Sequence, residues 1–195
     1  MATKFDICSS ALVQIGANKI TAFDSSSREA IVAGEIYDNT VEEWLAAYWW
    51  RFASKSQQLS RITGSDPVDP NWTAHYTQPG DMIAIESIQV AGVNIDFDRN
   101  ENKILCNASA TDAVIAEYTY AISETYWPAY FRRLIELDLM HKMSFALPAK
   151  LDLKRVLKED VDMYFRQAKS IDQKQQPNKP LPLSGRRSIM EFRRS

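Results

Sequence analysis

The feature that most constrains the fold is a pair of amphipathic helical patterns within residues 11–59, separated by a tight turn and followed by an aromatic cluster. The first pattern starts slightly upstream, with apolar residues at three- and four-residue steps that predict one face of a short helix: Phe5, Cys8, Leu12 and Ile15. Gly16 and Asn18 tolerate positive φ, which suits the end of that helix. The stretch contains no catalytic group and therefore predicts a scaffold.

A second helix is predicted after residues 25–27, because Ser26 and Glu29 have the spacing of a capping box. Its apolar stripe consists of Ala30, Gly34, Tyr37, Val41, Trp44 or Leu45, and Tyr48. Its other face is acidic and includes Glu35, Asp38, Glu42 and Glu43. A solvated surface is the simpler interpretation of those acids. The alternative is that they line a DNA channel, where they would repel phosphates and let DNA slide.

The middle of the chain has the pattern of a small antiparallel sheet. Residues 51–62 alternate imperfectly and predict an extended segment. Residues 63–80 predict a loop and irregular chain, because glycine and two Asp-Pro steps interrupt them. Three strands are expected after that, at residues 82–90, 103–107 and 113–122, with turn residues in the gaps.

Two more helices are expected after the sheet. Pro128 fits the first turn of the third helix, which is apolar over a broad face and should be largely enclosed. Asp152 opens the fourth helix. The stripe of this helix consists of Leu153, Val156 or Leu157, Val161, Tyr164 and Ala168.

The predicted fold class is α+β: an antiparallel four-helix bundle with a small inserted antiparallel β domain and an extended C-terminal tail. Residues 1–62 and 125–173 are expected to form the helical bundle. Residues 63–124 are expected to form the β-rich insertion, and residues 174–195 a flexible C-terminal arm. At 195 residues, one compact domain with an insertion is the expected organisation.

Composition excludes several classes of protein. A net charge of −2 argues against nucleic-acid binding driven by overall basicity. Cys8 and Cys106 are the only cysteines, so free thiols in a reducing compartment are expected rather than a disulfide framework or a metal site. Asp6 and its polar neighbours argue against a signal peptide, and no apolar run approaches the roughly 18 residues of a membrane span.

The spacing of Asp96, Asp98 and Asn100 is that of a calcium loop. Glu101 and Asn107, however, occupy the positions of the required glycine and of the closing glutamate. A hairpin turn is therefore the expected structure of this segment, and no metal site is predicted there.

His75 and His141 are the only histidines, and neither a nucleophile motif nor a Gly-rich phosphate loop accompanies them. No catalytic residue and no cofactor is therefore predicted, and His141 is expected to be satisfied within the bundle. The aromatic cluster could stack on single-stranded nucleic acid, but Arg51 is the only basic residue nearby. Core packing or a subunit interface is favoured for these residues: Trp44, Tyr48, Trp49, Trp50 and Phe52.

The C-terminal segment carries the clearest candidate for a binding site. Residues 174–195 hold six basic residues and one acidic residue, a net charge of +5, so the rest of the chain carries −7. The candidate partner-binding residues alternate basic and apolar character: Arg186, Arg187, Ile189, Met190, Phe192, Arg193 and Arg194. Such a segment fits a protein groove in which it becomes ordered. The alternative is a disordered terminus without a role.

Residues 11–59 also resemble the opening of the bacteriophage head-to-tail adaptors, a family of portal-binding connectors called tail tubular protein A in short-tailed phages. The residues that carry the resemblance are, in order, Ile15-Gly16, Ile20-Thr21, Glu29-Ala30, Tyr37-Asp38, and Trp50 followed by Phe52-Ala53. Residues 131–168 are more distantly similar to the Leu-rich helix of the family and the helix after it. Trp49 and Trp50 depart from the His-Pro-Trp-like sequence expected at that point.

The resemblance implies a non-enzymatic virion protein of the tail or neck, assembled in the host cytoplasm and without a cofactor. Such proteins form a homo-oligomeric ring, a dodecamer in this family, that joins the portal to the tail nozzle or next tail component. DNA passes through without sequence-specific binding, and no membrane is involved. Residues 186–194 would be the portal-docking arm.

Two alternatives stay open. One is a head-completion protein of a long-tailed phage, which differs mainly in the component below it. The other is a nucleic-acid-binding or enzymatic accessory protein that uses His75, His141 or the basic tail.

Overall fold

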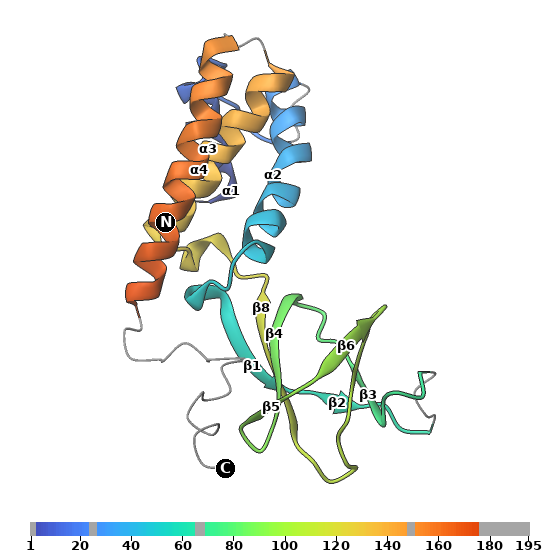
Figure 1. Ribbon diagram of the computed structural model, residues 1–195. Helices are drawn as coiled ribbons and strands as arrows, with labels where there is room; N and C mark the ends of the chain where they lie inside the picture. Colours follow the sequence, from blue (N-terminus) through green and yellow to red (C-terminus); the bar gives the residue numbers. More distant parts are fainter. Residues whose placement is uncertain (1–2, 24–26, 65–68, 148–150, 176–195) are drawn as a thin grey trace, which may run out of the picture.

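The computed structural model has two parts, a helical unit and a β unit (Figure 1). The structure describes residues 3–23, 27–64, 69–147 and 151–175, with the backbone alone for residues 151–153. Each unit has its own cluster of buried apolar side chains. The β unit is inserted into the helical unit, so that helices come both before and after it in the chain.

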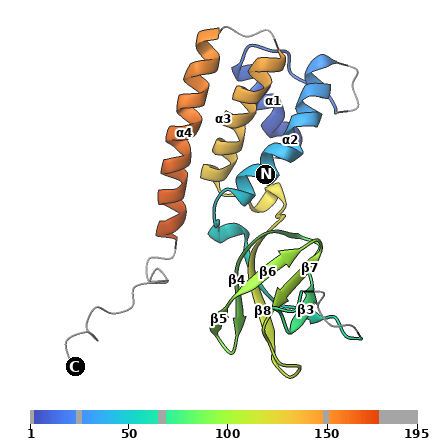
Figure 2. The ribbon, with the colours of Figure 1, turned by 45° about the vertical axis from the view of Figure 1, so that its right-hand side comes forward.

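Helix α3 (Ala129–Ala146) is the centre of the helical unit. Helices α1 (Lys4–Gln14), α2 (Arg28–Ala46) and α4 (Leu151–Lys174) all pack against it. Helices α2 and α4 run in the same direction, and α3 runs between them in the opposite direction (Figures 1 and 2). As the sequence predicts, α3 buries apolar residues over much of its circumference, among them Phe131, Leu134, Ile135, Leu139 and Met143.

Helix α1 is closed at both ends by local hydrogen bonds. The Thr3 hydroxyl accepts from the Asp6 N–H at 3.3 Å, and the Asp6 carboxylate accepts from the Thr3 N–H at 2.9 Å, which makes a capping box. Gly16 has a φ of 79°, and the Ala17 N–H donates to the Leu12 carbonyl at 3.0 Å. This is a Schellman ending, so the helix end expected at Gly16 is confirmed.

Ser27 caps the start of helix α2, and its hydroxyl accepts from the Ala30 N–H at 3.2 Å. Ser26, the cap expected from the sequence, lies outside the described residues. At the other end of the helix, Leu45 is buried and Trp44 is half-buried. The packing thus shows which of the two belongs to the buried stripe, a choice that the helical period alone left open.

The β unit contains two antiparallel sheets of four strands each. The first has the order β1-β8-β4-β5, with β1 (Ser54–Gln58), β8 (Val114–Tyr120), β4 (Met82–Val90) and β5 (Val93–Ile95). Strand β8 pairs with β1 on one side and with β4 on the other. Its central place fits its alternation of buried and half-buried residues.

The second sheet has the order β2-β3-β7-β6. Its strands are β2 (Ser60–Arg61), β3 (Ala74–Thr77), β7 (Lys103–Cys106) and β6 (Phe97–Asn100). Both sheets contribute to the core of the β unit, which includes Tyr76, Ile88, Ile104, Cys106, Ala116 and Tyr118. The unit therefore has its own core rather than depending on the helices for one.

The expected fold class is wrong in its balance of helix and sheet. The chain is an α+β protein with four helices and two four-stranded sheets, not a four-helix bundle with a small inserted β domain. Strands β1 and β2 come before residue 63, and β3 lies in a segment predicted to be irregular. The extended segment expected at residues 51–62 is confirmed as β1 and β2. Strand β1 is polar and mostly exposed, and its pairing with β8 is a long-range contact that the sequence pattern does not reveal.

The two units are joined by β1 and β8, which lie side by side. Ser54 and Thr119 are paired across them, just below the helices. Two short 3-10 turns, Arg51–Ala53 and Glu124–Tyr126, connect these strands to α2 and α3. The chain therefore leaves and re-enters the helical unit at one place (Figure 2).

An aromatic cluster centred on Trp50 fills the helical unit at this junction. Trp50 is 0% exposed, and its indole N–H donates to the Trp44 carbonyl at 2.6 Å. Five aromatic rings have centroids between 4.9 and 6.3 Å from that of Trp50, those of Tyr48, Phe52, Tyr130, Phe131 and Phe165. The core packing expected for this residue is confirmed, and it connects the end of α2 to α3 and α4.

We expect Trp50→Ala to lower the free energy of unfolding by about 3–5 kcal/mol, because it opens a cavity among those rings. Trp49→Ala is the matched control and should cost less, since Trp49 is only half-buried. Denaturant unfolding followed by far-UV circular dichroism measures both. An equal loss for the two variants would contradict the central role of Trp50.

Candidate functional site

The residues predicted to bind a partner lie outside the described part of the chain: Arg186, Arg187, Ile189, Met190, Phe192, Arg193 and Arg194. The described chain leading to them ends at Gln175, just after α4. The end of α4 lies near the junction of the two units (Figure 1). The structure therefore describes only the end of α4 from which this segment starts, and we call this end the base of the arm.

Asp172 holds that base in place. It is 0% exposed, on the last turns of α4. Its carboxylate accepts from the Tyr130 hydroxyl at 2.7 Å and from the Arg51 backbone N–H at 3.1 Å. The second bond is made to the first backbone N–H of the 3-10 turn after α2. One carboxylate thus connects the end of α4, the start of α3 and the turn that leads into the β unit.

A second polar group connects α2 and α3 within the helical unit. The Asp138 carboxylate, also buried, accepts from the Trp44 indole N–H at 2.9 Å and lies 3.1 Å from the Lys142 ammonium. Lys142 also pairs with Glu43 at 2.5 Å and donates to the Thr40 hydroxyl at 3.2 Å. Because each charge has partners, the arrangement is that of a structural network between helices.

A shallow pocket of about 350 Å³ lies between α1 and α3. On its wall the Glu136 carboxylate accepts from Ser10, from Gln14 at 2.7 Å and from Arg133 at 2.6 Å. The Nε atom of Arg132, which also lines the pocket, is buried without a hydrogen-bond partner among the described residues. The bonds of Glu136 hold α1 on α3, and the pocket has no further group that defines a reaction.

The two histidines do not form a common site. His75 is buried in β3 of the β unit, whereas His141 is on α3 of the helical unit. Burial lowers the pKa of the His141 imidazole, although its Nδ1 is 3.8 Å from an Asp138 carboxylate oxygen that favours the charged form. His141 also packs edge-on against Phe145, with 5.1 Å between ring centroids. These contacts indicate that His141 has a structural role within the helical unit.

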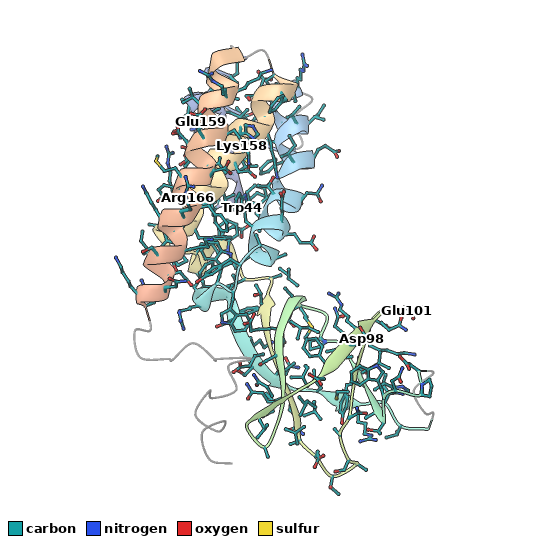
Figure 3. All side chains as sticks on the ribbon, viewed as in Figure 1. Trp44, Asp98, Glu101, Lys158, Glu159 and Arg166 are labelled. Carbon is teal, nitrogen blue, oxygen red and sulfur yellow. The ribbon has the colours of Figure 1, made fainter. Side chains whose placement is uncertain are left out.

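The possible calcium loop is part of a hairpin. Strands β6 and β7 pair with Asn100 opposite Lys103, and Glu101, with a φ of 53°, is in the turn between them (Figure 3). The Asp98 carboxylate accepts from the Arg99 backbone N–H at 2.7 Å. The hairpin expected there is therefore confirmed. Among the residues the structure describes, no group of three or more His, Cys, Asp or Glu side chains could hold a metal ion.

The acidic face of α2 is exposed, as the sequence predicts. Glu35, Asp38, Glu42 and Glu43 are all on the surface. Asp38 pairs with Lys4 at 2.8 Å, and Glu43 pairs with Lys142. Whether this face lines a channel stays a prediction.

Two features of α4 are not predicted by the sequence analysis above. Asp172 was not recognised as a buried carboxylate, because nothing in a helical pattern distinguishes it from a solvated aspartate. The helix also has a second apolar stripe, formed by Val156, Met163 and Ile171, which are 47%, 48% and 40% exposed. Their spacing of seven and eight residues was a readable signal, but the pattern left Val156 and Leu157 as alternatives for the buried stripe, and the structure buries Leu157.

Comparison of the chain with protein-family models and with curated protein sequences finds no match. None of the described helices is long and apolar enough to cross a membrane.

We expect Asp172→Ala to lower the free energy of unfolding by about 2–3 kcal/mol, because it removes the acceptor for the buried Tyr130 hydroxyl and the Arg51 N–H. Asp162→Ala is the matched control on the same helix. Asp162 is exposed and pairs with Lys158, so its loss should cost less than about 0.5 kcal/mol. Denaturant unfolding measures both changes. Hydrogen exchange of α4 should also accelerate in the first variant and not in the second.

Proposed function

We propose that this protein is a non-enzymatic head-to-tail adaptor of a tailed bacteriophage. Copies of it would form a ring that joins the portal to the tail nozzle or next tail component and passes DNA without reading its sequence. Binding would come from burial of surface between proteins and from ordering of the C-terminal arm, residues 174–195.

One observation carries the proposal: several of the residues that resemble the adaptor family build the core and a turn of the helical unit. Ile20, Ala30, Tyr37 and Trp50 are each 2% exposed or less. Gly16 makes the turn after α1 with a φ of 79°. Because these positions determine packing and turns, the resemblance concerns the fold of the helical unit. This supports using the resemblance as a guide to the class of protein.

The base of the arm gives further support. A segment that captures a partner works best from a fixed point, since less freedom is then lost on binding. The Asp172 carboxylate fixes the end of α4 through Tyr130 and the Arg51 N–H. The basic and apolar residues predicted to dock on the portal follow that fixed helix in the chain.

Deleting residues 177–195 should leave a folded protein that no longer binds a purified portal ring of the same phage. Circular dichroism checks the fold, and co-elution in size-exclusion chromatography measures binding. Two full-length variants distinguish the apolar from the electrostatic contribution to portal binding. Changing Ile189, Met190 and Phe192 to alanine should abolish binding at any salt concentration. Changing the four arginines to alanine should weaken binding most at low salt. Undiminished portal binding by the truncated protein would refute the role of the arm.

We also expect the free protein to be monomeric or weakly associated, and to oligomerise on the portal as a template. Light scattering coupled to chromatography, with and without portal, measures this. A stable dodecamer formed by the protein alone would contradict it.

A further inference from the structure

Helix α4 exposes an apolar stripe on the side that faces away from the helical core. Val156 and Met163 lie within about 20° of each other around the helix, and Ile171 lies about 80° from Met163, so the three occupy about a quarter of its circumference. They are 40–48% exposed, whereas Leu157, Val161 and Ala168 form the buried stripe against α3. Single exposed apolar residues are ordinary, but three on adjoining parts of one helix face favour a surface that packs against another protein.

The opposite edge of the helical unit is formed by α2, and its exposed face is acidic. Over Arg28–Ala46 there are five acidic side chains against one basic one. Glu35 and Glu42, seven residues apart, have no ion-pair partner within the part of the chain that the structure describes. Ile31, which is 55% exposed, gives the same face an apolar residue one turn from Glu35.

Helix α4 has the complementary charge. Between residues 154 and 174 there are six basic side chains against four acidic ones, and one of the acids, Asp172, is buried. Arg155 and Arg166 are exposed beside the apolar stripe, and neither has an ion-pair partner among the described residues. Figure 3 shows Arg166 on the side of α4 away from α2.

The contact between α2 and α4 defines how these two faces are oriented. The ring centroids of Trp44 on α2 and Phe165 on α4 lie 4.8 Å apart. Glu42 and Met163 each come two residues earlier, which is about 200° around a helix. They therefore point away from each other, to opposite sides of the helical unit. Because the two helices run in the same direction, Glu42 and Met163 are also at the same level.

We propose that the outer face of α4 in one copy of the chain packs against the outer face of α2 in the next copy. Two different surfaces on opposite edges make a heterologous contact, which closes into a ring when the rotation between copies allows it. The apolar stripe of α4 would cover Ile31 and the aliphatic parts of its neighbours. Arg155 and Arg166 would pair with the two unpaired glutamates. This inference rests on the proposed function for the ring, but the contact itself is tested without a portal.

Disulfide trapping tests the contact directly. The variant E42C/M163C places one thiol on each face, and the two cannot bridge within one chain because they point in opposite directions. On mild oxidation at high protein concentration, we expect a ladder of multimers on a non-reducing gel. The native thiols should not contribute, since burial raises the pKa of Cys8 to about 12 and that of Cys106 to about 11.

Two controls make the ladder specific. E42C/V93C moves the second thiol to the exposed Val93 on β5 and should give no ladder above background. E42C mixed with M163C should give dimers only. A ladder of equal yield from E42C/V93C would mean random collision and would overturn the proposal. Dimers formed by M163C alone as efficiently as by the mixture would show a symmetric contact between two α4 helices, which also overturns it. The complete absence of a ladder overturns it as well.

Charge reversal tests the pairing. In the E42C/M163C background, R155E/R166E should reduce ladder yield at least tenfold, because its α4 face then meets the acidic α2 face. Adding E35K to R155E/R166E should restore part of that yield, because it again places opposite charges on the two faces. Circular dichroism confirms that each variant is folded. If the reversed protein forms the ladder as well as its parent, or E35K restores nothing, the α4–α2 pairing is refuted. Portal binding by the arm is a separate measurement, so the two proposals can fail independently.

Discussion

The packing of Trp50 is the interaction on which the rest of the structure depends. Its indole bonds to the Trp44 carbonyl near the end of α2, and its ring contacts side chains from the start of α3 and the middle of α4. Its position directly precedes the 3-10 turn and strand that lead into the β unit. Burying one large side chain at this point therefore sets the angle at which three helices meet and the place where the chain leaves them.

Two buried carboxylates complete what apolar packing begins. Asp138 connects α3 to the Trp44 indole and to Lys142, and Asp172 connects α4 to Tyr130 and to the turn after α2. Buried charges are tolerated when hydrogen bonds satisfy them, and their geometry is more specific than that of apolar contacts. In this protein they fix how α4 sits on α3 and α2, and so which of its faces is left exposed.

The sequence predicted the helices and the three strands β4, β7 and β8, but it underestimated the number of strands in the β unit, for physical reasons. Helices α1 and α2 have local signals in their apolar spacing, in the serines before α2 and in Gly16. Strand β1 has only an imperfect alternation, which predicts extended chain but not its partner, because its residues are polar and its structure comes from pairing with β8. Strand β3 is short and follows a loop, so its buried residues were not distinguishable from those of irregular chain.

The candidate site also has one part that the sequence predicts and one part that it does not. The character of the C-terminal arm can be read from its residues, but the structure does not describe them. The fixed base of that arm could not be predicted, because a buried aspartate such as Asp172 follows the same helical period as an exposed one. Likewise, Val156 and Leu157 are equal candidates for the buried stripe until α3 is in place. Periodicity gives a helix two possible inner faces, and only its neighbours choose between them.

The pairing of Ser54 with Thr119 has a consequence for how this protein can vary. The chain leaves the helical unit next to the point where it re-enters. The whole β unit therefore connects α2 and α3 over a distance as short as a tight turn would span. Insertions, deletions or even replacement of the β unit would leave the path of the helices unchanged, provided that the first paired residues are kept. The β unit is thus a module that can change in size and surface while the helical framework stays constant.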